Sequence, residues 1–316
     1  MRNYILKRVL ILIPLLLTVS ILVFLVLRLG ANDPAMAYLR LSRIPPTDEA
    51  LCAARQLLGL DRPWAVQYLD WLWHAVRLDF GNAYVTGAPV LARILYYLPN
   101  TLYLAGVSLL MTIVLSLPLG ILAALNKDRW PDHLTRALAF TGVSMPGFWL
   151  GFLLVMLFSI RLGWLPPMGK GGVSHVIMPA FTLALMSLCI NIRLMRGSML
   201  EQLNTRSVLY ARVRGLSERR VMGCHVLKNS LIPVVTAIGM HIGEMLGGAV
   251  VVEMIFSWPG VGRFAVSSIY NRDFPVMQCF ILMMTMIFVF CNLAVDILYA
   301  WIDPRIRTGK GPDACI

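Results

Sequence analysis

Long apolar runs separated by shorter polar stretches dominate the hydrophobic pattern of this chain. A membrane-spanning helix needs about 20 mostly apolar residues. The runs predict six such helices, at Val9–Leu29, Thr101–Leu125, Ala137–Ile160, His175–Ile192, Leu231–Phe256 and Val276–Trp301. Because backbone N–H and C=O groups inside the hydrocarbon layer must be paired, we expect an all-α integral membrane protein.

The predicted spans are unevenly distributed along the chain. Residues 1–30 hold the first span, residues 31–100 an outer, periplasmic segment, residues 101–301 a core of five helices, and residues 302–316 a tail. The first span starts with basic residues, as a signal peptide does. Its apolar run is longer than the about 7–15 residues of a signal sequence, so we expect it to be retained.

The outer segment contains helix signals. Thr47-Asp48-Glu49 predicts a helix start, and Asp61-Arg62-Pro63 predicts a turn. The next stretch, Trp64–Leu78, has Val66, Leu69, Trp73 and Val76 near helical spacing. Tryptophan is favoured at membrane interfaces. We therefore expect short amphipathic helices, either packed as an outer cap or lying at the outer membrane surface.

The composition agrees with a membrane protein. The 316 residues are 58% hydrophobic and 14% charged, against about 25% charged in a soluble domain. An ordinary soluble protein and a disordered chain are thereby excluded. The six cysteines include no C-x-x-C pair, so neither a disulfide framework nor a zinc site is expected.

The net charge of +12 is explained mainly by orientation. Lysine and arginine fall mostly in alternate short loops, and loops rich in them remain in the cytoplasm. This rule places both the N-terminus and the C-terminus in the cytoplasm. The partner implied by the apolar background is the lipid bilayer, and nucleic-acid binding is not expected.

The inside loop over residues 193–230 is basic and also amphipathic. Val208, Leu209 and Ala211 alternate with arginines, and Gly215 followed by Ser217 predicts a helix end and a new start with Ser217 as N-cap. A solvated basic loop would explain the charge alone. A docking surface for a cytoplasmic protein explains both the charge and the apolar positions.

The same loop resembles the EAA loop of ABC importer permeases. The resemblance rests on Tyr210–Ser217 and His225–Asn229, although Leu209 and Tyr210 replace the Glu and first Ala of the family pattern. Further stretches resemble the peptide and nickel branch of that family, and most closely its nickel-transport permeases of "B" type. They are Leu58–Pro63, Asp79–Gly81, Ser144–Pro146, Gly248–Glu253, Trp258–Gly262 and Asp303–Arg305.

This resemblance implies a type I ABC importer permease in the bacterial inner membrane. It implies a second permease subunit, two ATPase subunits that use ATP and Mg, and a periplasmic binding protein. The residues implied to form the coupling helix against the ATPase are Leu209, Tyr210, Ala211, Arg212, Gly215, Leu216 and Ser217. No cofactor and no enzyme activity are expected of this chain, which lacks the phosphate-binding pattern G-x-x-x-x-G-K-[ST].

The cargo implied by the resemblance is nickel, as a chelate. A di- or oligopeptide is the alternative, and a stand-alone secondary transporter is a further hypothesis. The candidate pathway residues lie in the fifth predicted span, where His241 and Glu244 share a helix face with Met240 and Met245 nearby. Such a pair either lines a pathway or fixes helix packing. No firm metal site is predicted, because His241 and Glu244 suit only a transient metal contact.

Five other residues are predicted to be structural or to act in gating. Gly239, Gly243 and Gly247 recur every four residues and predict a close helix contact. Glu253 and Asp296 belong to the family pattern, which implies structural or gating roles for them.

Overall fold

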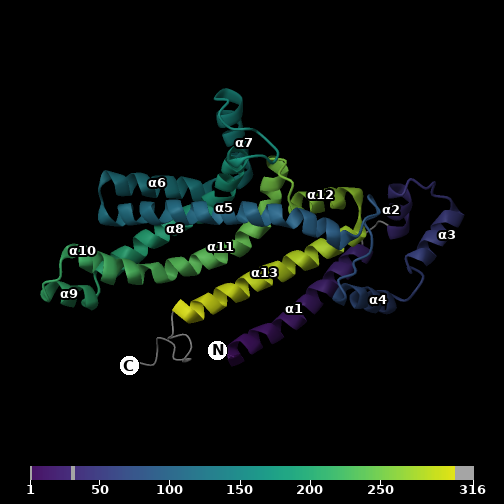
Figure 1. Ribbon diagram of the computed structural model, residues 1–316, viewed down its shortest axis with the longest axis horizontal. Helices are drawn as coiled ribbons and strands as arrows, with labels where there is room; N and C mark the ends of the chain where they lie inside the picture. Colours follow the sequence, from purple (N-terminus) through teal and green to yellow (C-terminus); the bar gives the residue numbers. More distant parts are fainter. Residues whose placement is uncertain (1, 30–32, 303–316) are drawn as a thin grey trace. The chain divides into compact units, whose positions relative to one another are not determined.

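The computed structural model describes the backbone of residues 2–29 and 33–302, and the side chains of 10–29, 33–295 and 297 (Figure 1). The described residues form helices and connecting turns, without a β-strand. The chain divides into two compact units. The first comprises residues 1–101 and 259–290, and the second residues 102–258 and 291–316.

The first unit contains the outer segment. Its elements are α1 (Arg2–Leu29), α2 (Pro34–Leu41), α3 (Asp48–Leu57), α4 (Trp64–Val76), the start of α5 (Val90–Leu125), α12 (Val261–Asn271) and most of α13 (Phe274–Ile302). The predicted helix start is confirmed, because the Thr47 hydroxyl oxygen accepts the Ala50 N–H at 3.2 Å. The predicted turn before Trp64 is also confirmed.

Two apolar clusters hold this unit together. Ala35 and Leu39 of α2 pack against Ala54 of α3. The second cluster joins α5, α12 and α13 through Val90, Ile94, Val261, Val276 and Cys279. A polar tie reinforces it, because the buried Asp273 carboxylate accepts the Val85 N–H at 3.2 Å. Burial raises the pKa of Asp273.

The second unit is built around α8. Its elements are the rest of α5, α6 (Trp130–Ser144), α7 (Gly147–Leu154), the π-helix η1 (Val155–Arg161), α8 (Val173–Leu203), α9 (Arg206–Val213), α10 (Glu218–Arg220), the π-helix η2 (Val221–Leu227), α11 (Lys228–Ile255) and the end of α13. Helices α6, α7 and α11 all contact α8. The stretch 193–230 thus comprises the end of α8, the three short elements α9, α10 and η2, and the start of α11.

Helix α5 approaches α8 closely at one glycine. A side-chain carbon at Gly120 would lie 2.7 Å from Met195 Cβ and 3.0 Å from the Ile192 carbonyl oxygen. The same two helices also meet at the other end of the unit, where Leu104 and Val176 belong to one cluster. The two helices are therefore packed along most of their shared length.

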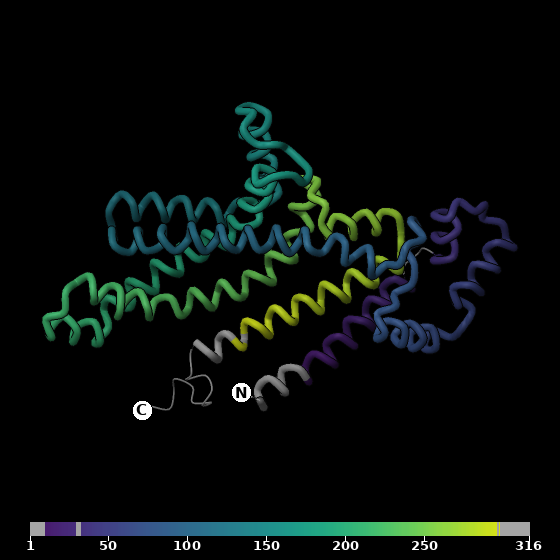
Figure 2. The backbone as a smooth tube through the Cα atoms, viewed as in Figure 1, coloured from purple at the N-terminus to yellow at the C-terminus, as the bar shows by residue number. Residues whose placement is uncertain are grey.

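The third predicted span, Ala137–Ile160, is not one straight helix. Helices α6 and α7 are bent by 108° at a break between Ser144 and Gly147, and the change of direction is visible in Figure 2. Pro146 has no N–H to continue the helix, and it disfavours helical backbone in the preceding residue. Met145 accordingly is extended, with φ −87° and ψ 123°.

The number of apolar spans agrees with the expected fold class. Within the described residues, five helices are long and apolar enough to cross a membrane, and the bent pair gives a sixth if it counts as one span. Several spans extend beyond their predicted ends, as α5 does with 36 residues. Helix continuation past the apolar core depends on contacts that hydropathy does not report.

Candidate functional site

Helix α9 presents one side to its own unit and the other to solvent. Val208 and Ala211 are buried and pack in the cluster that contains Met195 of α8. Leu209 and Tyr210 lie on the opposite side, exposed. Together with Arg212, Gly215 and Ser217 these exposed residues are called the α9 surface below. Among the predicted coupling residues, Ala211 therefore holds α9 against the rest of its unit and is not itself exposed.

The turn after α9 requires a glycine. Gly215 has φ +73°, which is in the left-handed region. Its N–H donates to the Arg212 carbonyl at 2.9 Å, and the Leu216 N–H donates to the Ala211 carbonyl at 3.2 Å. These two bonds form the Schellman motif that ends many helices. An ion pair between Arg212 and Glu218, at 2.8 Å, spans the turn.

Ser217 lies where the sequence predicts a helix start. Its backbone is the N-cap of α10, and its carbonyl accepts the N–H groups of Arg220 and Val221. Its side chain, however, makes no capping hydrogen bond. The following π-helix η2 leads directly into α11, so the α9 surface is connected through a short segment to the fifth span.

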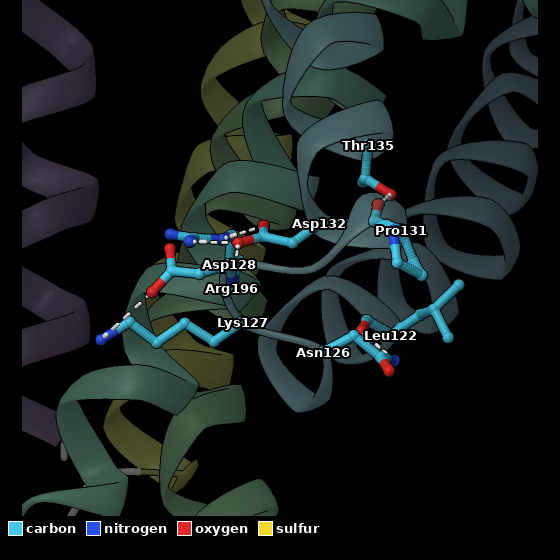
Figure 3. A network of polar contacts seen from close by, with 8 residues as sticks. All are labelled: Leu122, Asn126, Lys127, Asp128, Pro131, Asp132, Thr135 and Arg196. Carbon is cyan, nitrogen blue, oxygen red and sulfur yellow. Dashed lines mark hydrogen bonds and ion pairs between the residues drawn. The ribbon is translucent and has the colours of Figure 1, made fainter.

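A buried ion pair lies near this region and was not anticipated from the sequence. The Asp132 carboxylate of α6 accepts two hydrogen bonds from Arg196 of α8, at 2.6 and 2.7 Å (Figure 3). The side chain of Asp132 is 0% exposed and that of Arg196 is 19% exposed. Arg196 follows Met195 on α8, so the pair fastens α6 to the helix on which α9 packs.

The same carboxylate also shapes the turn between α5 and α6. It accepts the backbone N–H of Asp128 at 3.0 Å, and Asp128 has φ +60°. Aspartate is among the residues that tolerate this conformation. In the sequence, Asp132 is typical of an acidic residue in the first turn of a helix. Nothing local identifies a partner 64 positions away.

A cavity of about 310 Å³ lies among α7, α8 and α11. Its lining is mostly apolar, with three methionines and one aromatic ring, and it contains one carboxylate. The lining includes Met145, Phe148, Met186, Met245, Thr182 and Glu244. Of the four predicted pathway residues, only Glu244 and Met245 border this cavity, and Met240 is exposed elsewhere on α11.

His241 and Glu244 interact as their spacing predicts. His241 Nδ1 and Glu244 Oε2 are 2.8 Å apart, but the His241 side chain is 5% exposed and that of Glu244 57%. His241 Nε2 is buried and has no hydrogen-bond partner among the described residues. The imidazole thus lies behind the carboxylate, and Glu244 is the member of the pair that meets the cavity.

Glu244 belongs to an exposed face of α11. Met240, Gly247 and Val251 are also exposed, and with Glu244 they follow one another at intervals of three or four residues, so they share one side of the helix. An ionised carboxylate in contact with lipid acyl chains would be costly. This face of α11 is therefore suited to a polar pathway or to another protein subunit.

The glycines of the predicted stripe differ in how closely other side chains approach them. Gly239 is packed against Val295 so closely that a side-chain carbon would overlap it, whereas no atom lies within 4 Å of such a carbon at Gly247. Gly243 and Glu253 are buried. The Asp296 side chain lies outside the described residues. Structural or gating roles for these residues stay predictions.

No cluster suited to hold a metal is found in the described part of the chain, where no three His, Cys, Asp or Glu side chains come together. His241 and Glu244 supply two groups and no third. Stable nickel ligation at this pair therefore finds no support in the arrangement of side chains.

Comparison with known families identifies the chain. Residues 116–308 match the binding-protein-dependent transport system inner membrane component family, and residues 1–105 match its N-terminal part. The chain belongs to this family. It is accordingly a multi-pass inner membrane protein and a permease subunit of an ABC importer, and the ATPase and substrate-binding protein are separate partners. The stand-alone transporter hypothesis does not hold.

Similar proteins agree with this assignment. The glutathione transport system permease protein GsiC of Salmonella typhimurium strain LT2 is 42% identical over 308 residues, covering 97% of this chain and 99% of the relative. GsiC of Escherichia coli strain K12 gives the same values. The family predicted from the sequence is confirmed, whereas these relatives do not support its nickel-specific member.

Two solved structures share the fold. One is the inward-facing MetNI methionine ABC transporter, with TM-score 0.56 and 17% identity, covering 68% of this chain and 96% of that chain. The other is an amino acid ABC transporter with histidines, with TM-score 0.53 and 15% identity, covering 68% and 94%. The type I importer permease fold expected from the sequence is thereby confirmed.

Proposed function

We propose that this chain is the translocation subunit through which an ATP-driven importer moves glutathione or another small peptide into the cell. The observation that carries the proposal is the 42% identity to glutathione permeases over 97% of the chain. This favours the peptide alternative over the nickel chelate. The similarity extends over the outer segment and over the fifth span, where the pathway residues are predicted.

The cavity at Glu244 supports a peptide cargo. Its volume of about 310 Å³ lies within the range of sites for small molecules, about 300–1,000 Å³. Proteins bind hard divalent ions through several oxygen ligands, and imidazole is a suitable ligand for nickel. The cavity instead offers one carboxylate among mostly apolar side chains, three of them methionines, which suits a small organic molecule with a cationic amino group.

Uptake by the reconstituted importer tests the cargo. The whole complex, with its binding protein and ATPase subunits, is placed in proteoliposomes and supplied with ATP. We expect uptake of radiolabelled glutathione that unlabelled small peptides reduce and nickel salts do not. Uptake of radiolabelled nickel without any peptide uptake would refute the peptide proposal. A complex with an inactive ATPase subunit measures leakage.

We further propose that the α9 surface contacts an ATPase subunit and that a second permease subunit completes the pathway beside α11. The support for the first contact is a helix anchored on α8 by Val208 and Ala211 while Leu209 and Tyr210 remain exposed. The support for the second is the exposed face that contains Glu244 and Gly247. ATP and Mg would be bound by the ATPase subunits, not by this chain.

A charge placed on the α9 surface tests the coupling role. Gly215→Asp adds a carboxylate where no neighbouring atom lies within 4 Å of the new side-chain carbon. Gly163→Asp is a matched control, because Gly163 has φ +64° and an equally open surrounding. We expect Gly215→Asp to reduce uptake roughly tenfold or more, equivalent to about 1.4 kcal/mol of lost interaction, with unchanged membrane insertion. Equal uptake by both variants would contradict the coupling role.

A further inference from the structure

Helix α4 in the outer segment carries an apolar stripe that nothing in the described chain covers. Val66, Leu69, Trp73 and Val76 are between 44% and 72% exposed. The opposite side of the helix is packed, with Gln67 and Ala75 buried. Four large apolar side chains on one exposed helix face are unusual for a segment surrounded by water. Something apolar is expected to cover this stripe.

The contacts of α4 place it beside a membrane span. The Tyr68 hydroxyl is 2.8 Å from the Ser20 hydroxyl of α1, and Tyr68 and Trp71 both meet the Phe24 ring, with centroids 5.5 and 6.3 Å apart. Figure 1 shows α4 next to α1. These contacts fix the level of α4 along α1.

That level lies within the apolar part of α1. The span Leu10–Leu29 has 20 residues and is about 30 Å long, which matches the thickness of the hydrocarbon core. Ser20 precedes the outer end at Leu29 by about 13 Å along the helix axis. A tyrosine side chain is too short to cover that distance from above the membrane. Helix α4 therefore lies at the depth of the outer leaflet.

The remaining flank of α4 is polar and indicates where water lies. Gln67, Asp70 and His74 line a cleft of about 250 Å³ together with Arg28, at the outer end of α1. Helix α4 thus has one side on α1, one on a polar cleft and one apolar side. An amphipathic helix at a membrane interface divides its surface in this way, with its apolar side buried about 5–10 Å below the headgroups.

Lipid is also favoured by the surroundings of the stripe. Ile21, Leu22 and Val26 of α1 are exposed apolar residues at the same level, so both helices expose apolar side chains at this depth. Arg77 follows α4, and its guanidinium lies over the Trp73 ring at 4.2 Å. Arginine and tryptophan together are typical of the headgroup region.

We propose that α4 is inserted in the outer leaflet beside α1, with Val66, Leu69, Trp73 and Val76 in contact with lipid. In this arrangement lipid covers the apolar stripe, and a soluble partner does not. Part of the segment predicted as periplasmic, residues 31–100, is then a membrane-embedded element. A binding protein arriving from outside would meet the cleft side of α4 and not its stripe.

Spin labels at single cysteines test this proposal in the whole importer, held in nanodiscs of phosphatidylethanolamine and phosphatidylglycerol. Leu69→Cys and Val76→Cys probe the stripe, in a chain whose native cysteines are replaced by alanine. Asp70→Cys is the matched control on the polar flank of the same helix, and native Cys52, exposed on α3, is a second one. Collisions with oxygen report lipid, and collisions with a water-soluble chromium oxalate complex report water.

We expect oxygen collisions to exceed chromium collisions severalfold at residues 69 and 76, and the reverse at residues 70 and 52. Chromium access at residues 69 and 76 equal to that at Cys52 would overturn the proposal in favour of a cap in water. Low access to both reagents would overturn it in favour of a protein partner on the stripe. Maleimide labelling of the same cysteines without a spin label, slow at residues 69 and 76 and fast at residues 70 and 52, checks the result.

Discussion

The ion pair between Asp132 and Arg196 offers a way to measure how much the contact between α6 and α8 contributes to the free energy of unfolding. The Asp132 carboxylate is fully buried, and Arg196 donates to both of its oxygens at 2.6 and 2.7 Å. Asp132→Asn keeps the shape of the side chain but leaves the guanidinium without its counter-charge. Paired hydrogen bonds between charged groups are among the stronger ones in proteins, so their loss should be measurable.

The expected magnitude follows from the burial of the pair. Removing one partner of a buried ion pair costs about 3–5 kcal/mol, because the other charge is left uncompensated. Arg196 keeps 19% of its side-chain surface exposed, so water can solvate part of its charge. We therefore expect Asp132→Asn to lower the free energy of unfolding by about 2–4 kcal/mol.

The assay is thermal unfolding of the purified importer in nanodiscs at fixed protein and lipid concentration. Asp128→Asn is the control, because Asp128 lies on the same turn and its exposed carboxylate, 4.0 Å from Lys127, attracts Arg196 less than Asp132 does (Figure 3). It should change stability by no more than about 0.5 kcal/mol. Arg196→Met and the double variant complete a cycle, in which we expect a coupling energy of about 2 kcal/mol. Equal effects of Asp132→Asn and Asp128→Asn, or simple additivity with Arg196→Met, would refute this reasoning.

Three further predictions concern other parts of the chain. Gly120→Ala should lower the free energy of unfolding by about 1–3 kcal/mol because the added carbon overlaps α8. Gly106→Ala is the control and should not lower it, because no atom lies within 4 Å of a side-chain carbon there. Unfolding measurements on both variants test this. Glu244→Gln should raise the KM for peptide uptake more than His241→Gln does, since only Glu244 borders the cavity, and equal effects would indicate a packing role for the pair. Thr47→Ala should destabilise α3 by about 1 kcal/mol through loss of its N-cap bond; unchanged hydrogen exchange in α3 would contradict this.

The outer segment shows which structural features can be predicted from residues that are close together in the sequence. The start of α3 and the turn before α4 could be predicted, because capping residues and proline act within a few positions. The helical spacing of Val66, Leu69, Trp73 and Val76 was also visible. Whether that stripe faces a cap or the membrane depends on the contact between Tyr68 and Ser20, 48 positions apart, and no local pattern reports it.

The sequence by itself determined the membrane class, the apolar spans, the family and the position of the turn at Gly215. These follow from hydropathy, from spacing along one helix and from residues read in order. Only the tertiary structure decided that Asp132 meets Arg196, that His241 lies behind Glu244, and that α4 lies beside the apolar part of α1. The physical reason is that burial and pairing depend on which helix faces which, and this is decided by packing between segments far apart in the chain.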